Sequence, residues 1–383
     1  MISKTKYKIE NKEIEKIFRA AGIGGITGIS PLGAGEYNAV FSVSTREKEY
    51  VLKIAPAQEA PVMTYEKDMM RAEVFWYRQM REHTPITVPD VYFEDFERKQ
   101  IPTDYFIMEK LSGKQLDQMK FSGSEQVQSN FITATMAAQI HKIKNDQFGY
   151  IQNGLYDNWY QAIRAMTQSL LDDCARAKKK SKRGEKLLAC IDRYQDVLKK
   201  AECCMVNFDI WWPNIICNRE NGEIKYAWID PERSFWGDRI ADFVCLEYQK
   251  PLEKKKASLA AYNAVADEPI RVTREEKIRY AVMQGYLGLI QEVEKILPLH
   301  AKALRLVAQR FLLRMVLQKR FRRLEIKMTE KTKRSGALPP RPHWGERASS
   351  PPGAPLCSNH HGRPAAQCRL YADRYAVCQL GRG

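Results

Sequence analysis

The chain has 383 residues, of which 44% are hydrophobic and 28% charged, a composition typical of a globular protein, and its length suggests two domains or lobes. It contains no apolar run of about 18 residues, so we expect no membrane-spanning helix. The formal net charge of +16 would suit nucleic acid, but the densest basic run, residues 178–183, has no interleaved aromatic residue for base stacking, so we expect no nucleic-acid partner. The N-terminus lacks the apolar stretch of a secretory signal and the nine cysteines have no regular spacing, which favours a reducing cytoplasm.

The first part of the chain alternates short strands with a single helix. Strands are expected at residues 37–45, 50–54, 91–96 and 105–108. A helix is expected at 66–81, where apolar residues recur at helical spacing.

Beyond residue 113 the pattern is mainly helical, apart from two strands expected at 215–218 and 226–229. The expected helices lie at 124–143, 158–175, 184–200, 240–249, 273–296 and 299–327. Strands with one helix, followed by helices, predict an α+β fold of two lobes, residues 1–109 and 110–334, joined by a hinge between Glu109 and Gly113.

The composition changes near Ser335. From there to Gly383 the chain has neither Lys nor Ile and is rich in Arg, Pro, Gly and Ala. We expect residues 335–383 to be disordered, because such a segment has no apolar periodicity to offset the entropy of ordering. The cysteines and histidines of this segment have no regular zinc-ligand spacing, so we expect no zinc site there.

Gly33 and Gly35 lie where one strand should turn into the next. Glycine at such a turn lets backbone N–H groups approach phosphate oxygens closely. An ordinary hairpin turn explains the two glycines equally well. The chain has no Gly-x-x-x-x-Gly-Lys-Ser/Thr motif, which excludes a P-loop as the phosphate-binding element.

Lys53 is flanked by apolar residues on a strand that should be largely buried. A buried lysine needs an ionic partner or a phosphate group. Glu73, on the following helix, could pair with it and so direct the lysine to the phosphates of a nucleotide. The alternative is a lysine at the edge of the sheet and an exposed glutamate.

The most informative stretches are residues 206–214 and 228–230. Apolar residues fix the position of each stretch and leave Asp209, Asn214 and Asp230 as the polar side chains. This spacing is typical of phosphoryl transfer from a magnesium nucleotide, in which one carboxylate orients the attacking hydroxyl while an amide and a second carboxylate hold the metal. A hairpin between the two strands would bring Asn214 and Asp230 to one end, where Mg²⁺ could bridge them. Taken singly, each of the three could be an ordinary turn residue.

Across about residues 25–250 the chain resembles the aminoglycoside phosphotransferase and choline kinase superfamily, small-molecule kinases that share the protein-kinase fold. The matching pieces occur in the family's order: Val51–Ile54, Ala72–Glu73, Ile107–Glu109, Ile140–His141, Asn207–Asn214, Ile229–Asp230 and Gly237–Phe243. The resemblance implies a small antiparallel sheet with one main helix as the first lobe, and a larger, mainly helical second lobe.

The resemblance also implies ATP or GTP with Mg²⁺, and a small hydroxyl-bearing acceptor. Asp209 would be the catalytic aspartate, and Asn214 and Asp230 the metal ligands. Asp242 resembles the aspartate that braces the catalytic loop, and His141 a structural histidine beneath the site. The implied nucleotide-binding residues are Gly33, Gly35, Lys53, Glu73, Met108 and Glu109.

The chain departs from the family at two places. The family commonly has His-Gly-Asp where this chain has Asn207-Phe208-Asp209, and often Asp-Trp-Glu or Asp-Phe-Glu where this chain has Asp230-Pro231-Glu232. Because Asp209 is retained, we expect an active small-molecule kinase. The alternative is a non-catalytic nucleotide-binding regulatory module with the same fold. The acceptor, the preference for ATP or GTP and the oligomeric state stay open.

Overall fold

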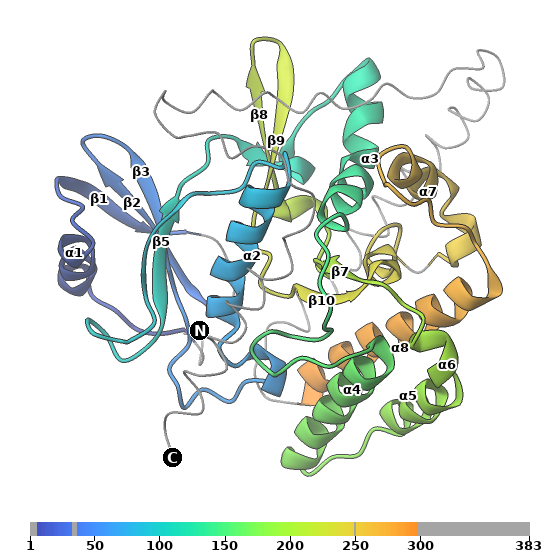
Figure 1. Ribbon diagram of the computed structural model, residues 1–383. Helices are drawn as coiled ribbons and strands as arrows, with labels where there is room; N and C mark the ends of the chain where they lie inside the picture. Colours follow the sequence, from blue (N-terminus) through green and yellow to red (C-terminus); the bar gives the residue numbers. More distant parts are fainter. Residues whose placement is uncertain (1–5, 33–36, 249, 297–383) are drawn as a thin grey trace, which may run out of the picture.

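The computed structural model describes residues 6–32, 37–248 and 250–296. Its first lobe is a five-stranded antiparallel sheet in the order β1-β2-β3-β5-β4, with helix α1 on one face and α2 on the other (Figure 1). The elements are α1 (Asn11–Ala20), β1 (Ile26–Pro31), β2 (Ala39–Thr45), β3 (Glu49–Ile54), α2 (Met69–His83), β4 (Val91–Asp95) and β5 (Tyr105–Glu109).

The two faces of the sheet belong to two separate hydrophobic cores. On β3, Tyr50, Leu52 and Ile54 pack with α1, whereas Val51 packs with α2. Side chains of a strand alternate between its faces, so Lys53 points to the same side as Val51, towards α2. The period of the strand therefore directs a lysine into the space between the sheet and the helix that carries Glu73.

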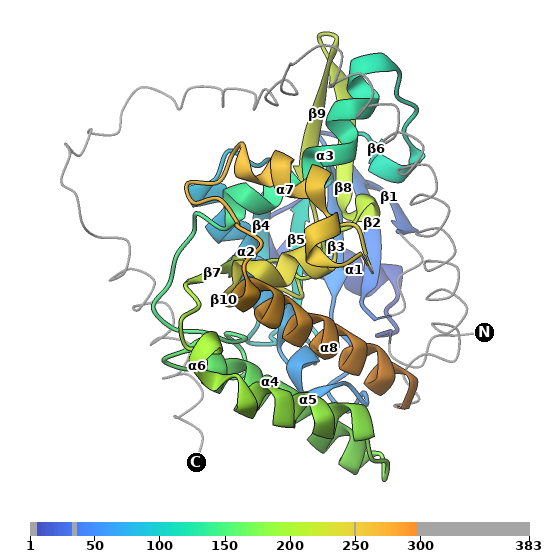
Figure 2. The same ribbon diagram turned by 90° about the vertical axis from the view of Figure 1, so that its right-hand side faces the viewer.

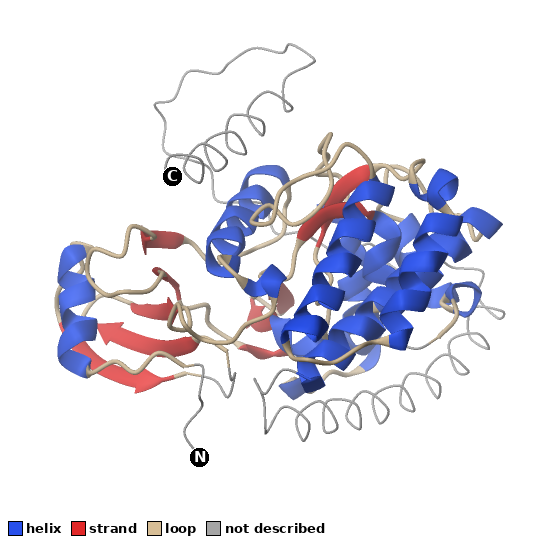
Figure 3. Ribbon diagram, turned by 90° about the horizontal axis from the view of Figure 1, so that it is seen from below, coloured by secondary structure: helices blue, strands red, loops and turns tan. Residues whose placement is uncertain are grey.

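The second lobe is mainly helical and also holds two small sheets, which adjoin the first lobe (Figure 3). Its helices are α3 (Gly123–Ile140), α4 (Trp159–Arg176), α5 (Lys182–Arg193), α6 (Gln195–Leu198), α7 (Lys256–Asn263) and α8 (Arg274–Ile296). One sheet joins β6 (Lys114–Gln115), β8 (Ile215–Glu220) and β9 (Glu223–Trp228), and the other pairs β7 (Cys203–Val206) with β10 (Phe235–Asp238). The predicted α+β architecture with two lobes is confirmed.

Several predicted elements differ from the structure. The helix expected at 240–249 is a short 3-10 helix, Arg239–Val244, whose first turn is capped by the Asp238 carboxylate. The helix expected at 184–200 is divided at Tyr194 into α5 and α6, because the backbone of that residue leaves the helical region (φ −107°, ψ 23°). Helices α1 and α7 and strands β7 and β10 were not predicted.

The helix expected at 299–327 and the tail at 335–383 lie outside the described residues. Within the described part of the chain, no helix is both long and apolar enough to cross a membrane.

Candidate active site

The ammonium group of Lys53 contacts three carboxylates between the two lobes. Its Nζ lies 2.7 Å from Glu73 Oε2, 3.1 Å from Asp230 Oδ1 and 3.0 Å from an oxygen of Glu232. Burial opposes the charge of Lys53, but the three carboxylates outweigh it and hold its pKa well above the ordinary value. The predicted contact between Lys53 and Glu73 is present, and the edge-lysine alternative does not hold.

Glu73 is fully buried on α2, and burial raises the pKa of its carboxyl group. Breaking one side of a buried pair leaves the other charge without compensation, which costs several kcal/mol, roughly 3–5. The pair therefore fixes α2 against β3. On the same helix, the Tyr77 hydroxyl accepts a hydrogen bond of 2.9 Å from the backbone N–H of Asp230, so α2 also holds the residue opposite Lys53.

Asp209 lies on a loop whose backbone is held by the buried carboxylate of Asp242. The Asp242 carboxylate accepts hydrogen bonds from the backbone N–H of Asn207 at 3.1 Å and from that of Phe208 at 2.7 Å. His141 Nε2 lies 2.9 Å from the same carboxylate, and its other ring nitrogen contacts Tyr262. The bracing contact predicted for Asp242 is confirmed, and His141 orients it.

Phe208 occupies a backbone conformation that favours glycine. Its φ is +58°, in the left-handed region, which costs an ordinary L-residue about 1–2 kcal/mol. The related family commonly has glycine at this position. Here the side chain is buried, and its ring centroid lies 5.3 Å from that of Phe235 and 5.8 Å from that of Tyr286. Packing of the buried ring thus offsets the free-energy cost of the left-handed backbone conformation, and the loop keeps this conformation without a glycine.

Asn214 links the loop of Asp209 to the segment that carries Asp230. Its Nδ2 donates to the backbone carbonyl of Asp209 at 3.2 Å and, at 3.4 Å, to an oxygen of the Asp209 carboxylate. Its own carbonyl accepts from the N–H of Ile229 at 2.9 Å, directly before Asp230. The register of the β8–β9 hairpin, Ile215 opposite Trp228, places both residues at the same end as expected.

Glu232 joins the site without having been predicted. It contacts Lys53, and one of its carboxylate oxygens accepts from Asn38 Nδ2 at 3.1 Å. Its position two residues after Asp230 had been noted only as part of a departure from the family pattern. Asn38, the residue directly before β2, was also missed.

The oxygen donors beside Lys53 fit a hard divalent cation. Asp230 keeps 41% of its side chain exposed, and the amide nitrogen of Asn214 is used by Asp209, which leaves the amide oxygen available. Carboxylate and amide oxygens are the ligands that Mg²⁺ prefers, and the rest of its shell is usually water and phosphate. Among the described residues, no group of three or more His, Cys, Asp or Glu side chains is arranged to hold a metal by itself. One carboxylate and one amide oxygen are typical of a Mg²⁺ ion whose other ligands are water and phosphate oxygens.

Two other predicted nucleotide-binding residues, Met108 and Glu109, lie at the end of β5. Met108 is buried on β5 opposite Val51, and Glu109 is the last residue of that strand. The N–H of Glu109 donates to the carbonyl of Asp90 at 2.7 Å. Gly33 and Gly35 lie outside the described residues.

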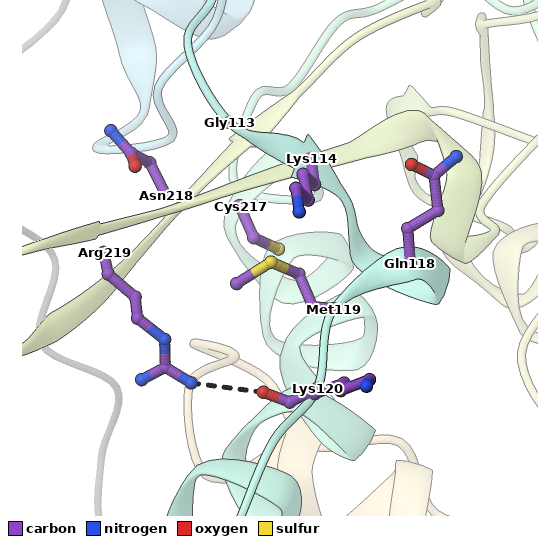
Figure 4. A pocket seen from close by; sticks show the side chains of 8 residues that line it. All are labelled: Gly113, Lys114, Gln118, Met119, Lys120, Cys217, Asn218 and Arg219. Carbon is purple, nitrogen blue, oxygen red and sulfur yellow. Dashed lines mark hydrogen bonds between the residues drawn. The ribbon is translucent and has the colours of Figure 1, made fainter.

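A hollow of about 700 Å³ opens elsewhere on the second lobe, beside β6 and β8 (Figure 4). It is lined by Gly113, Lys114, Gln118, Met119, Lys120, Cys217, Asn218 and Arg219. None of the predicted site residues lines it. The polar groups around Lys53, rather than this hollow, therefore form the candidate site.

A sequence profile described as the phosphotransferase enzyme family matches residues 28–270. No curated protein sequence matches the chain.

Three solved structures are similar in fold. A protein from Ralstonia eutropha assigned as an aminoglycoside phosphotransferase has a TM-score of 0.53 and 15% identity, over 77% of this chain and 91% of its own. Choline kinase from Streptococcus pneumoniae has a TM-score of 0.51 and 14% identity, over 76% of this chain and 91% of its own. A protein from Haemophilus somnus assigned as fructosamine-3-kinase has a TM-score of 0.50 and 18% identity, over 75% and 96%. The predicted kinase-like fold is confirmed.

Proposed function

Because this chain belongs to the phosphotransferase enzyme family, we propose that it transfers the γ-phosphate of ATP to a hydroxyl group of a small molecule. The observation that carries the proposal is the continuous set of contacts from Lys53 through Asp230 and Asn214 to Asp209. GTP is the alternative donor. A non-catalytic regulatory module would not need Asp209 fixed by both Asn214 and the Asp242-braced loop.

Each residue of the site has a role that its position allows. Lys53, held by Glu73, would bind phosphate oxygens, and Asp230 with Asn214 would hold Mg²⁺, with Glu232 as a further oxygen ligand. The ion neutralises charge on the phosphates when it is bound. Asp209 would orient the acceptor hydroxyl and accept its proton. Phosphoryl transfer depends mainly on such positioning and charge stabilisation.

We propose further that Met108 and Glu109 contact the base of the nucleotide at the end of β5, and that residues 1–109 and 110–334 are the two lobes. Gly33 and Gly35 would cover the phosphates. Five cysteines of the described residues form no disulfide bond, which suits a cytoplasmic protein: Cys174, Cys190, Cys203, Cys204 and Cys217. The acceptor is a small hydroxyl compound; the similar proteins bear the names of aminoglycoside, fructosamine and choline kinases.

Calorimetric titration of ATP with and without Mg²⁺ tests the nucleotide site. Asp230→Ala should abolish the binding that depends on Mg²⁺, because it removes the carboxylate that is free to reach the ion. Asp196→Ala, on the surface of α6 with a 90% exposed side chain, is the matched control and should bind MgATP like the wild type. Wild-type affinity of Asp230→Ala for MgATP would place the metal site elsewhere.

A further inference from the structure

The segment between β3 and α2 crosses from the first lobe to the second. Residues 62–66, which include the 3-10 turn Thr64–Glu66, lie against α4 (Figures 1 and 2). Met63, Tyr65 and Glu66 are buried although the segment belongs to a connection. A connection is normally exposed, because its backbone groups need water or other partners. The partners of this one come from the second lobe.

Thr64 and Asp173 form the centre of this contact. The backbone N–H of Thr64 donates to Asp173 Oδ2 at 2.8 Å, and its hydroxyl donates to Oδ1 at 2.6 Å. Asp173 lies on α4 and is 1% exposed. A buried carboxylate is costly unless it is hydrogen-bonded, and hydrogen bonds to a charged acceptor are stronger than those between neutral groups. The buried Asp173 carboxylate therefore depends on its two hydrogen bonds from Thr64.

Three further side chains of the second lobe hold the backbone of the same segment. Arg176, which also pairs with Asp173, donates to the carbonyl of Val62 at 2.6 Å. Gln152 donates to the carbonyl of Tyr65 at 2.8 Å, and Asn153 to that of Thr64 at 3.3 Å. The Tyr65 ring also stacks on Tyr150 with centroids 5.3 Å apart.

The anchored segment ends next to groups of the candidate active site. The Glu66 carbonyl accepts a hydrogen bond of 2.9 Å from the hydroxyl of Tyr37, the first described residue after Gly33 and Gly35. The neighbouring Asn38 is bonded to Glu232. On its other side the segment leads directly into α2, which carries Glu73. Both the start of β2, through Tyr37, and the helix that carries Glu73 are thus connected to residues 62–66.

We propose that Asp173 is a positioning residue that, through Thr64, fixes the phosphate-binding groups of the first lobe relative to the second lobe. The proposal rests on the proposed function, since it concerns the site that would bind MgATP. Without this contact, the bonds from Arg176, Gln152 and Asn153 would remain, but the segment that leads into α2 would be held less firmly against α4. Part of the ordering that nucleotide binding requires is therefore complete before the nucleotide arrives.

Two substitutions each remove part of the contact with little change in shape, and the backbone N–H of Thr64 is kept in both. Thr64→Val replaces the hydroxyl by a methyl group, and Asp173→Asn removes one acceptor and the charge. We expect each to raise the Kd for MgATP by about 10- to 100-fold, the range of one lost hydrogen bond to a charged acceptor. The double variant should be no weaker than about the worse single variant, because both changes break the same contact.

Adenosine and two control variants separate positioning from loss of structure. Adenosine lacks phosphates, so its affinity should stay within about twofold of the wild type, whereas a lower folded fraction would reduce both affinities equally. Thr64→Ser keeps the hydroxyl and should restore MgATP binding. Asp172→Asn, one residue before Asp173, should be neutral, because the Asp172 carboxylate is exposed on α4 and accepts a hydrogen bond from Gln168 of the same helix.

The proposal is overturned if Thr64→Val and Asp173→Asn bind MgATP like the wild type, or if they lose affinity for adenosine to the same extent as for MgATP. Amide hydrogen exchange supplies a second readout: residues 62–66 should exchange faster in Asp173→Asn than in Asp172→Asn, and equal protection would also refute the contact. A wild-type protein that binds no MgATP would refute the proposed function instead, while the exchange experiment would still decide on the contact itself.

Discussion

Replacing Phe208 by glycine and by alanine should reverse the usual order of stability. In most buried positions glycine is the worse replacement, because it gains more freedom in the unfolded chain, at a cost of about 0.5–1 kcal/mol relative to alanine. Phe208 has φ +58°, however, and alanine keeps the cost of a left-handed backbone whereas glycine does not.

The magnitude follows from burial and backbone conformation. Phe208 is 2% exposed and packs against Phe235 and Tyr286, so Phe208→Ala should lower the free energy of unfolding by about 3–5 kcal/mol. Phe208→Gly loses the same packing but recovers about 1–2 kcal/mol of backbone strain and gives up about 0.5–1 kcal/mol of entropy. The glycine variant should therefore be more stable than the alanine variant by about 0.5–1 kcal/mol.

Urea denaturation at equilibrium measures this difference. Phe243 offers a matched control, since it is fully buried in the 3-10 helix Arg239–Val244 and has no positive φ. There, Phe243→Ala should be more stable than Phe243→Gly. If alanine is also the better replacement at 208, the loop before Asp209 does not have the left-handed turn described above.

Two other substitutions test the surroundings of the site. Burial raises the pKa of Glu66 to about 7 from an ordinary 4.5, so the folded protein binds a proton that the unfolded chain releases. The free energy of unfolding should then fall as pH rises from about 4.5 to about 7. Glu66→Gln should remove up to about 3 kcal/mol of this fall. If urea denaturation shows the same pH dependence in the variant as in the wild type, Glu66 is not its source. Asp242→Asn should lower turnover by about 10- to 100-fold yet leave the Kd for MgATP within about threefold, because it loosens the loop of Asp209 and not the ligands of the ion. Loss of MgATP binding by this variant would show that Asp242 acts on the nucleotide.

The sequence predicted those parts of the site that depend on local periodicity. Alternation along β3 turned Lys53 to the side of Val51, and helical spacing placed Glu73 on the facing side of α2. The hairpin that joins Asn214 to Asp230 followed from two short apolar strands. Helix α1 carried a comparable signal in Ile14, Ile17 and Phe18, which recur at helical spacing and are fully buried, but it was not recognised.

Other features depend on contacts that no local pattern encodes. Strands β7 and β10 have four residues each and are buried throughout, so they show no alternation of apolar and polar side chains. The contact between Thr64 and Asp173 joins residues 109 positions apart, and neither residue is unusual in its own segment. Glu232 was missed because its role arises from the turn that brings it back to Lys53.

Acceptor-dependent transfer of phosphate from MgATP tests the central claim most directly. Wild-type protein is incubated with hydroxyl-bearing metabolites and antibiotics, including amino alcohols, sugars, fructosamines and aminoglycosides, and both ADP release and the phosphorylated product are measured. The account predicts that at least one acceptor is phosphorylated, and that Asp209→Asn binds MgATP normally but turns over at least about 100-fold more slowly. Near-normal turnover of Asp209→Asn with that acceptor would contradict it.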